Sequence, residues 1–431
     1  MASDQGALVY VTVIGAGYVG LVTAAGLAGL GHRVRVGEAD EERASQLSQG
    51  YVPIFEPDLE RLVRDGVEQE LLSFHTSNSE AVSGADVVFI AVPTPEGENG
   101  AADLSIIEHV MGEIGGHLEP EALVVMKSTV PVGSTGRFQE ELRRLGAEVV
   151  VLSNPEFLRE GSAVADFFHP DRIVIGSKDQ RAVEKMVELY RGLDAPIVVT
   201  DPVSSEMIKY GSNAYLATRV TFANAMANLC EAVGADARDV LLGMGYDRRI
   251  GFHFLSPGPG FGGSCLPKDT RALVAIAEES GYDFALLQGV IEVNDEQARR
   301  VVAKVRENSG GSLQDKVVAV WGLAFKAGTD DTRDSPAVRL VELLSDEGAA
   351  IRAFDPHARP IIPGVQVGAD AVDTAKGADA LLIATEWSEF QTVDLGEVRD
   401  SMRGDLVVDA RNLLDPDAVR RLGLRYVGIG R

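Results

Sequence analysis

One cysteine of this chain stands in a setting that favours chemistry over packing. Cys265 lies in "GPGFGGSCLPKDT" (258–270), where four of the seven preceding residues are glycine. Pro267 predicts the first turn of a helix that begins beside the thiol, and the positive end of a helix dipole favours a thiolate. Lys268 adds positive charge, and Asp269 projects back along the same helix face. We interpret Cys265 as a nucleophile; the alternative, a small buried hydrophobe, suits the other cysteine of the chain, Cys230.

A second constellation is the glycine-rich turn "GAGYVG" near the N-terminus, which lies between a strand-like run and a small-residue helical stretch. Glycines let the backbone approach a pyrophosphate at a helix N-terminus, and a carboxylate after the next strand, here Glu38, binds a ribose diol. The pattern predicts a dinucleotide site, with NAD favoured because Glu38 would repel a 2′-phosphate. A tight strand–helix turn without a ligand is the alternative. The loop residues are Gly15, Gly17, Tyr18, Val19 and Gly20.

A dinucleotide and an activated thiol together indicate oxidation through a thioester, which needs donors for an oxyanion and a base for water. "KYGSN" places Lys209 and Asn213 at i and i+4, as an oxyanion pair or as a solvated helix face. "NPEFLREG" gives Glu156 and Glu160 the same spacing after a predicted strand. A carboxylate there could activate water; a helix-capping or surface pair is the alternative.

These residues need a framework of strands that end in polar loops. Apolar runs ending in small polar or acidic residues recur at 84–95, 122–133 and 148–157, and the pattern returns between 316 and 415. Ligands of α/β sheets bind at such strand ends. The fold class is therefore α/β, with two Rossmann-like doubly wound domains, of which the second could hold a different nucleotide.

Residues between these two regions are predicted to be helical, with one helix of about thirty residues from 203 to 234. That helix is a hinge or dimer spine, or else a plain connector. The predicted divisions are 1–200 for the NAD-binding domain, 201–305 for the central helical region with Cys265, and 306–431 for the second Rossmann-like domain.

Composition excludes several classes of protein. The formal charge of −25 over 431 residues argues against a nucleic-acid binder, so an anionic ligand would need a few placed Arg and Lys residues. Two cysteines make no disulfide framework and no metal cluster, which fits a cytoplasmic enzyme. No apolar run approaches about 18 residues, and "MASDQGALVY" lacks the pattern of a signal peptide. We expect neither a membrane partner nor a bound metal.

Over nearly its whole length the chain resembles the UDP-glucose 6-dehydrogenase family of nucleotide-sugar dehydrogenases. The matching stretches are "VIGAGYVGLV", "STVPVGS", "NPEFLREGSAVADFFHPDRIVIG", "EMIKYGSNAYLATRVTFANA", "RIGFHFLSPGPGFGGSCLPKD" and "FKAGTDDTRDSPA". The resemblance implies two successive NAD-linked oxidations at one sugar carbon, from a primary alcohol to a carboxylate through a cysteine adduct.

The resemblance also implies roles for individual residues. Cys265 would be the nucleophile, Lys209 and Asn213 would stabilise oxyanions, and Asp269 would transfer protons with Lys209. Glu156 would assist thioester hydrolysis, and Thr129 would position water. Besides the glycine loop, the implied NAD contacts are Glu38, Arg43, Thr94, Thr129, Glu160, Lys268 and Arg333. The implied sugar-nucleotide contacts are Glu156, Phe157, Leu158, Lys209, Asn213, Arg249, Ser256, Gly260, Phe261, Gly262, Phe325, Lys326 and Arg411. Arg249 would reach the substrate of a neighbouring subunit, which implies a homodimer or a larger assembly.

Two features leave alternatives open. Gly37 precedes Glu38 where the family usually has an aliphatic residue followed by Asp, so adenosine affinity is expected to shift. "SCLPKD" also occurs in relatives that act on other nucleotide sugars. UDP-glucose is the expected substrate; thymidine-diphosphate glucose, UDP-N-acetylmannosamine and GDP-mannose are the alternatives. A two-electron epimerase or a non-catalytic NAD binder is the second class of function, and the set of Cys265, Lys209 and Asn213 argues against it.

Overall fold

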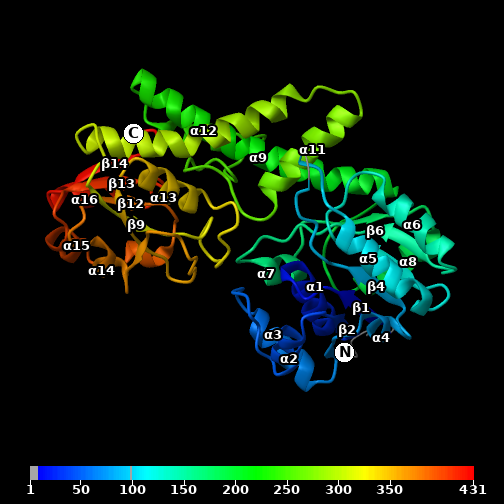
Figure 1. Ribbon diagram of the computed structural model, residues 1–431. Helices are drawn as coiled ribbons and strands as arrows, with labels where there is room; N and C mark the ends of the chain where they lie inside the picture. Colours follow the sequence, from blue (N-terminus) through cyan, green and yellow to red (C-terminus); the bar gives the residue numbers. More distant parts are fainter. Residues whose placement is uncertain (1–7, 98–99) are drawn as a thin grey trace. The chain divides into compact units, whose positions relative to one another are not determined.

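The computed structural model describes residues 8–97 and 100–431, and the chain divides into two compact units, Met1–Ser212 and Asn213–Arg431. Strands and helices alternate along most of both units (Figure 1). Seven of the N-terminal residues on which the expectation of no signal peptide rests lie outside the described part of the chain.

An eight-stranded sheet forms the first unit, in the order β3-β2-β1-β4-β5-β6-β7-β8. Its first six strands have the order of a dinucleotide-binding sheet. The strands are β1 (Tyr10–Ile14), β2 (Arg33–Gly37), β3 (Leu72–His75), β4 (Val87–Ile90), β5 (Leu123–Met126), β6 (Val150–Ser153), β7 (Ile173–Gly176) and β8 (Ile197–Thr200). The helices are α1 (Tyr18–Gly29), α2 (Glu41–Ser48), α3 (Leu59–Glu68), α4 (Asn78–Val82), α5 (Ser105–Ile114), α6 (Ser134–Arg144), α7 (Ala163–Phe168) and α8 (Gln180–Leu189).

Buried side chains cover both faces of this sheet. Val87 and Phe89 of β4 belong to a core formed with α1, α7 and α8, whereas Val88 and Ile90 belong to a core formed with α5 and α6. Successive side chains of a strand point to opposite faces, so a continuous apolar run is the signature of a strand buried on both sides.

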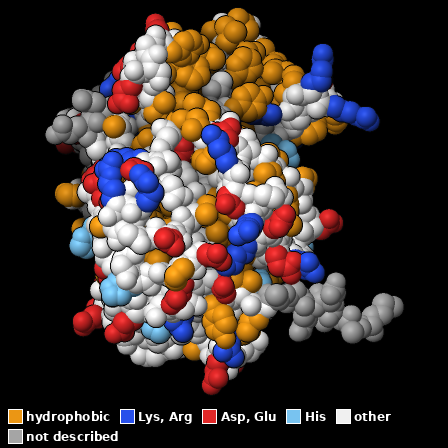
Figure 2. All heavy atoms as spheres, turned by 90° about the vertical axis from the view of Figure 1, so that its right-hand side faces the viewer, with side chains coloured by type: hydrophobic (Ala, Val, Ile, Leu, Met, Phe, Trp, Pro, Cys, Tyr) orange, Lys and Arg blue, Asp and Glu red, His pale blue; other side chains and the backbone are white. Residues whose placement is uncertain are grey.

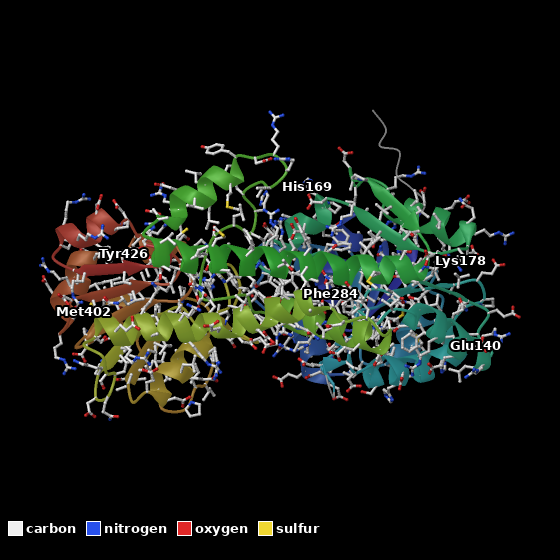
Figure 3. The ribbon with its side chains drawn as sticks, turned by 90° about the horizontal axis from the view of Figure 1, so that it is seen from above. Glu140, His169, Lys178, Phe284, Met402 and Tyr426 are labelled. Atoms are coloured by element: carbon white, nitrogen blue, oxygen red, sulfur yellow. The ribbon has the colours of Figure 1, made fainter. Side chains whose placement is uncertain are left out.

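The longest helix, α9 (Pro202–Val233), has 32 residues, which makes it about 48 Å long, and contains the boundary between the two units. In the second unit it lies beside α12 (Ala285–Asn308) (Figure 3). Asn228 Nδ2 donates to Gln297 Oε1 at 2.9 Å, and Lys304 Nζ lies 2.5 Å from Glu231 Oε1. These polar contacts fix the two helices along a mostly apolar seam.

The second unit adds a six-stranded parallel sheet in the order β11-β10-β9-β12-β13-β14. Its strands are β9 (Val317–Trp321), β10 (Ala350–Phe354), β11 (Gln366–Val367), β12 (Ala380–Ile383), β13 (Leu406–Asp409) and β14 (Arg425–Gly428). Its further helices are α10 (Ala237–Gly245), α11 (Leu266–Glu279), α13 (Pro336–Asp346), α14 (Ala371–Ala375), α15 (Leu395–Ser401) and α16 (Pro416–Arg421). Trp321 and Phe390 pack on one face of this sheet.

The expected fold class is confirmed: the chain has an eight-stranded and a six-stranded sheet, both mainly parallel, and between them in the sequence a helical region with one long helix. The sequence patterns did not predict β3, β7 and β8 as strands, nor the antiparallel pair between Ser153 of β6 and Gly176 of β7. The expected three-part division at residues 200 and 305 stays a prediction.

Candidate active site

The glycine-rich loop joins β1 to α1 at the carboxyl end of the first sheet. Gly15 has a φ of +99°, and a Cβ there would lie 2.8 Å from the carbonyl oxygen of Ala91. A Cβ on Gly20 would lie 1.9 Å from the carbonyl oxygen of Gly15, so both glycines serve close packing. A Cβ on Gly17 would have no atom within 4 Å. That space, at the N-terminus of α1, fits a pyrophosphate.

Glu38 is fixed beside the same loop. One carboxylate oxygen accepts a hydrogen bond from Ala16 N at 3.2 Å, and the other accepts from Asp40 N at 2.9 Å. Arg43 Nη1 lies 3.9 Å from the carboxylate. Two backbone donors thus hold the acceptor for a ribose diol in place, and the residues present fit a dinucleotide.

The glycine at position 37, directly before Glu38, has a local structural reason. A Cβ there would lie 2.4 Å from Asn78 Oδ1 and 2.9 Å from Ile14 Cδ1. Asn78 is held in that position because its Nδ2 donates to Glu113 Oε2 at 2.8 Å. Asn78 of α4 thus occupies the space that a side chain at position 37 would need.

The loops after β4, β5 and β6 bring further expected residues to the same sheet edge. Thr94 is buried after β4, and Thr129 is half-buried after β5. Phe157, Leu158 and Glu160 follow β6, and the Arg172 guanidinium carbon lies 3.4 Å from the centre of the Phe157 ring. The segment containing Glu156 and Glu160 forms no helix, so the helical spacing inferred for that pair was wrong.

Glu156 instead turns inward to Lys209 of α9. Lys209 Nζ donates to Glu156 Oε1 at 2.7 Å and to the Glu156 carbonyl oxygen at 2.8 Å, and both residues are buried. Burial would raise the pKa of Glu156, but the ammonium of Lys209 outweighs burial and holds that pKa below its ordinary value. The surface-pair alternative for Glu156 is therefore excluded.

A second buried lysine, Lys127, lies in the same neighbourhood at the end of β5. Its Nζ donates to Asn154 Oδ1 at 3.1 Å, and Tyr190 donates its hydroxyl to the same oxygen at 2.6 Å. Burial lowers the pKa of Lys127 from 10.5 to about 8; Glu156 opposes this shift and Lys209 adds to it. Lys127 and Lys209 thus both place positive charge near the carboxylate of Glu156.

Cys265 is the N-cap of α11, with Pro267 in the first turn as predicted. Its Sγ lies 3.6 Å from Ser264 Oγ. Asp269, one turn later, is buried and accepts hydrogen bonds from Asn213 Nδ2 and Lys268 Nζ, both at 2.6 Å. Helix α9 therefore carries Lys209 and Asn213 one turn apart, each bound to a different carboxylate.

Amide side chains of two helices hold the glycine-rich loop that precedes Cys265. Asn224 Oδ1 accepts from Gly258 N at 2.8 Å, and Gln297 Nε2 donates to Gly258 O at 2.8 Å. Asn294 Oδ1 accepts from Phe261 N at 2.8 Å. These three amides were missed in the sequence, where polar residues on helices suggest exposed faces, and only their position among apolar neighbours could have signalled them.

Two glycines of this loop lie against other segments of the second unit. A Cβ on Gly262 would lie 2.2 Å from the Asp334 carbonyl oxygen, and one on Gly263 would lie 2.8 Å from the Phe325 ring. Arg411 Nη2 donates to Phe325 O at 2.8 Å. The structure thus brings the loop, Phe325 and Arg411 together; Gly260 and Phe261 are buried within the loop, Lys326 follows Phe325, and Ser256 is exposed.

Two expected anion-binding arginines share one local geometry. Arg249 donates its backbone N–H and Nε to Asp247 Oδ1, at 2.9 and 3.1 Å, and its Nη2 to Asp247 Oδ2 at 2.7 Å. Arg333 repeats this pattern on Asp331, at 2.9, 2.9 and 2.6 Å. In both turns, "DRR" and "DTR", an aspartate two residues earlier holds the guanidinium in a forked pair.

Within residues 8–97 and 100–431, no three His, Cys, Asp or Glu side chains are grouped to hold a metal ion. Over the same residues, no helix is long and apolar enough to cross a membrane.

Comparison with known proteins places this geometry in context. Profiles of the UDP-glucose/GDP-mannose dehydrogenase family match residues 9–194 (NAD binding domain), 203–296 (central domain) and 319–416 (UDP binding domain). A UDP-glucose 6-dehydrogenase of Rhizobium meliloti is 46% identical over 98% of this chain and 99% of its own length. One from Bacillus subtilis is 43% identical over 98% and 97%.

Solved structures agree with these sequence relatives. A UDP-glucose dehydrogenase of Pyrobaculum islandicum superposes with a TM-score of 0.92 at 36% identity, covering 100% of this chain and 99% of the other. A UDP-D-ManNAc dehydrogenase of Pyrococcus horikoshii superposes with a TM-score of 0.88 at 28% identity, covering 98% and 99%.

Proposed function

Because the chain belongs to the UDP-glucose/GDP-mannose dehydrogenase family of NAD-dependent nucleotide-sugar dehydrogenases, we propose that it oxidises UDP-glucose to UDP-glucuronate. The observation that carries the substrate is the 46% identity with a UDP-glucose 6-dehydrogenase over nearly the full length of both chains. The overall change consumes one water and two NAD⁺, and it yields a carboxylate, two NADH and three protons.

Cys265 is the nucleophile of this proposal. Its position as N-cap of α11 supports a thiolate, since the helix dipole and Lys268 both favour negative charge there. The thiolate attacks the aldehyde carbon, forms a C–S bond and leaves an oxyanion that is then protonated. NAD, held by the glycine loop and Glu38, supplies a hydride acceptor for each of the two oxidations.

Lys209 and Asn213 stabilise the oxyanions. The ammonium of Lys209 brings positive charge into a buried site, where an electrostatic interaction is stronger than in water. Asn213 Nδ2 is oriented by the carboxylate of Asp269, which also accepts a hydrogen bond from Lys268 Nζ. Asp269 and Lys209 exchange the protons that the alcohol and the oxyanion release or take up.

Water must finally release the acid from the thioester. Glu156, kept ionised by Lys209, accepts a proton from the attacking water, and Thr129 orients that water. The C–S bond then breaks, and Cys265 leaves as a thiolate that is ready for the next turnover. Arg249, Arg411, Phe325 and the loop 256–262 bind the sugar nucleotide in this scheme.

A substrate panel tests the assignment. Purified protein is mixed with NAD⁺ and one nucleotide sugar at a time, and absorbance at the NADH maximum is followed to completion. Two NADH per UDP-glucose are expected, with slower turnover of UDP-N-acetylmannosamine, thymidine-diphosphate glucose and GDP-mannose. If any of these three sugars had a higher kcat/KM than UDP-glucose, that sugar would be the assigned substrate. A yield of one NADH per sugar would contradict the thioester step.

We propose a homodimer or a larger assembly as the working form. Helix α9 exposes large apolar side chains at Tyr215, Phe222, Leu229 and Val233, between 49% and 69% exposed. Hydrophobic side chains also gather in the upper part of Figure 2. Exposed apolar surface of this kind marks a protein interface, and the side chain of Arg249, paired with Asp247, is 89% exposed at the surface.

A further inference from the structure

A buried carboxylate outside the expected site ties two parts of the NAD-binding region together. Glu56 lies in the segment between α2 and α3 and is 6% exposed. Its Oε2 accepts the Tyr18 hydroxyl and Gly161 N, the latter at 2.6 Å, and its Oε1 accepts Ala163 N at 2.7 Å. Tyr18 is the first residue of α1, within the glycine loop, and Gly161 directly follows Glu160.

The charge of Glu56 has no direct use in binding an anion. A carboxylate repels a pyrophosphate, so its burial near the glycine loop must serve another end. Its three donors, a hydroxyl and two backbone amides, are all neutral. Hydrogen bonds to a charged acceptor are shorter and stronger than neutral ones, and three of them fix the positions of their donors.

Tyr18 reinforces the same link from the other side. Its oxygen lies 3.0 Å from Gly161 N, so tyrosine and carboxylate converge on one amide. Burial and the neighbouring Glu56 raise the pKa of Tyr18, so its hydroxyl remains a donor. Gly161 has a φ of +82°, which marks a turn that few other residues would adopt.

We propose that Glu56 is a positioning residue for the cofactor, which clamps the glycine loop to the turn that follows Glu160. The clamp joins the end of β1 to the segment after β6, so both sides of the NAD site are held before the cofactor arrives. A pre-ordered site binds more tightly, because less freedom is lost on binding. The inference rests on family membership for NAD and does not depend on which sugar is oxidised.

The test compares three variants by their affinity for NAD. Glu56→Gln keeps the size of the side chain but makes one carboxylate oxygen an NH₂, which cannot accept a backbone N–H. Tyr18→Phe removes the tyrosine link and leaves both amide bonds. Glu60→Gln is the matched control, because Glu60 is an exposed glutamate of α3 paired with Arg64. Calorimetry with NAD⁺ and no sugar nucleotide gives each dissociation constant.

We expect the NAD dissociation constant to rise by about 10- to 100-fold in Glu56→Gln and by a smaller factor in Tyr18→Phe, and to be unchanged in Glu60→Gln. In turnover assays of Glu56→Gln, the KM for NAD should rise together with the NAD dissociation constant. The KM for the sugar nucleotide should stay within about twofold of the wild-type value. Amide hydrogen exchange of a peptide covering 159–168, measured without NAD, should be faster in Glu56→Gln than in wild type.

These measurements can overturn the proposal whether or not Glu56→Gln folds. Wild-type NAD affinity and wild-type exchange in a folded Glu56→Gln protein would overturn it. If Glu56→Gln does not fold, the decision falls to Tyr18→Phe, in which unchanged NAD affinity and unchanged exchange over 159–168 overturn the clamp. Loss of affinity for NAD and sugar nucleotide alike would indicate general loosening of the fold, which also contradicts a positioning role.

Discussion

At the scale of single residues, the proposed role of Cys265 as a nucleophile rests on where the thiol is placed. The thiol begins a helix, follows a loop held by buried amides, and lies one turn from an aspartate already bound to Asn213 and Lys268. None of these contacts is needed to bury a small hydrophobe, which is the role Cys230 plays at 3% exposure.

We expect Cys265→Ser to lower kcat by at least ~10³-fold, the scale seen when a nucleophile is removed. A serine hydroxyl is not ionised at neutral pH, whereas a helix N-terminus favours the thiolate form of a cysteine. NADH production reports the loss, and calorimetric NAD affinity and circular dichroism should remain those of wild type. Cys230→Ser is the control; comparable turnover by both variants would contradict the thioester mechanism.

The lowered pKa of buried Lys127 predicts that the free energy of unfolding depends on pH. Its pKa falls from 10.5 unfolded to about 8 folded, so the unfolded chain binds more protons between these values. Stability should therefore rise with pH across that window, by roughly 3 kcal/mol from this residue. Replacing Lys127 by Met removes the effect, so the melting temperature of wild type relative to Lys127→Met should climb between pH 7.5 and 10.

The control for this measurement is Lys185→Met, because Lys185 is a partly exposed lysine that lies 3.2 Å from Asp86. Its melting temperature relative to wild type should change little over the same range. A difference between wild type and Lys127→Met that stays flat with pH would show that folding leaves the pKa of Lys127 at its ordinary value, which would contradict this prediction.

At the scale of elements, α9 does more than connect. Glu206 of α9 is buried and accepts hydrogen bonds from Gly133 N at 2.5 Å, Thr135 N at 2.8 Å and Thr135 Oγ1 at 2.6 Å. A side chain of one helix thus caps the first turn of another, α6. The loop with Thr129 ends at this cap.

Glu206→Ala should reduce the free energy of unfolding by about 2–4 kcal/mol, because three donors lose their acceptor in a buried place. Chemical denaturation followed by circular dichroism measures the change. Glu140→Ala, on the exposed side of α6, should change it by less than about 0.5 kcal/mol. An equal effect of the two substitutions on the free energy of unfolding would contradict a stabilising role for the Glu206 cap.

The elements also mark how far sequence patterns reach. Continuous apolar runs ending in polar residues predicted the strands that precede Thr94, Thr129 and Glu156, since parallel strands are buried on both faces. The spacing of Glu156 and Glu160 misled, because spacing implies a shared face only where a helix forms. Lys127, Glu56 and Asn224 could not be predicted, since what buries each of them is packing by segments distant in the chain.

At the scale of the whole molecule, a formal charge of −25 surrounds a site for two anionic ligands. Long-range repulsion must be overcome by a few local cations, among them Arg249, whose proposed target is the substrate of another subunit.

Co-expression tests that assembly. Cys265→Ser and Arg249→Ala chains are each expected to be inactive. In a dimer of one of each, one of the two sites regains both groups, and half of randomly paired dimers are mixed. About a quarter of wild-type activity should therefore return. Hetero-dimers as inactive as their parents, or an active monomer in light scattering, would contradict the shared site.

The forked turns at Arg249 and Arg333 have a consequence for how ligands compete. Each guanidinium is already matched by an aspartate two residues before it, so taking hold of a phosphate is an exchange of partners. Added salt weakens the old pair and the new one together. The affinity for NAD and for the sugar nucleotide should therefore fall only gently with ionic strength, less than a site of bare cations would. If both arginines bind their ligands as proposed, this protein selects an anion by its shape as well as by its charge.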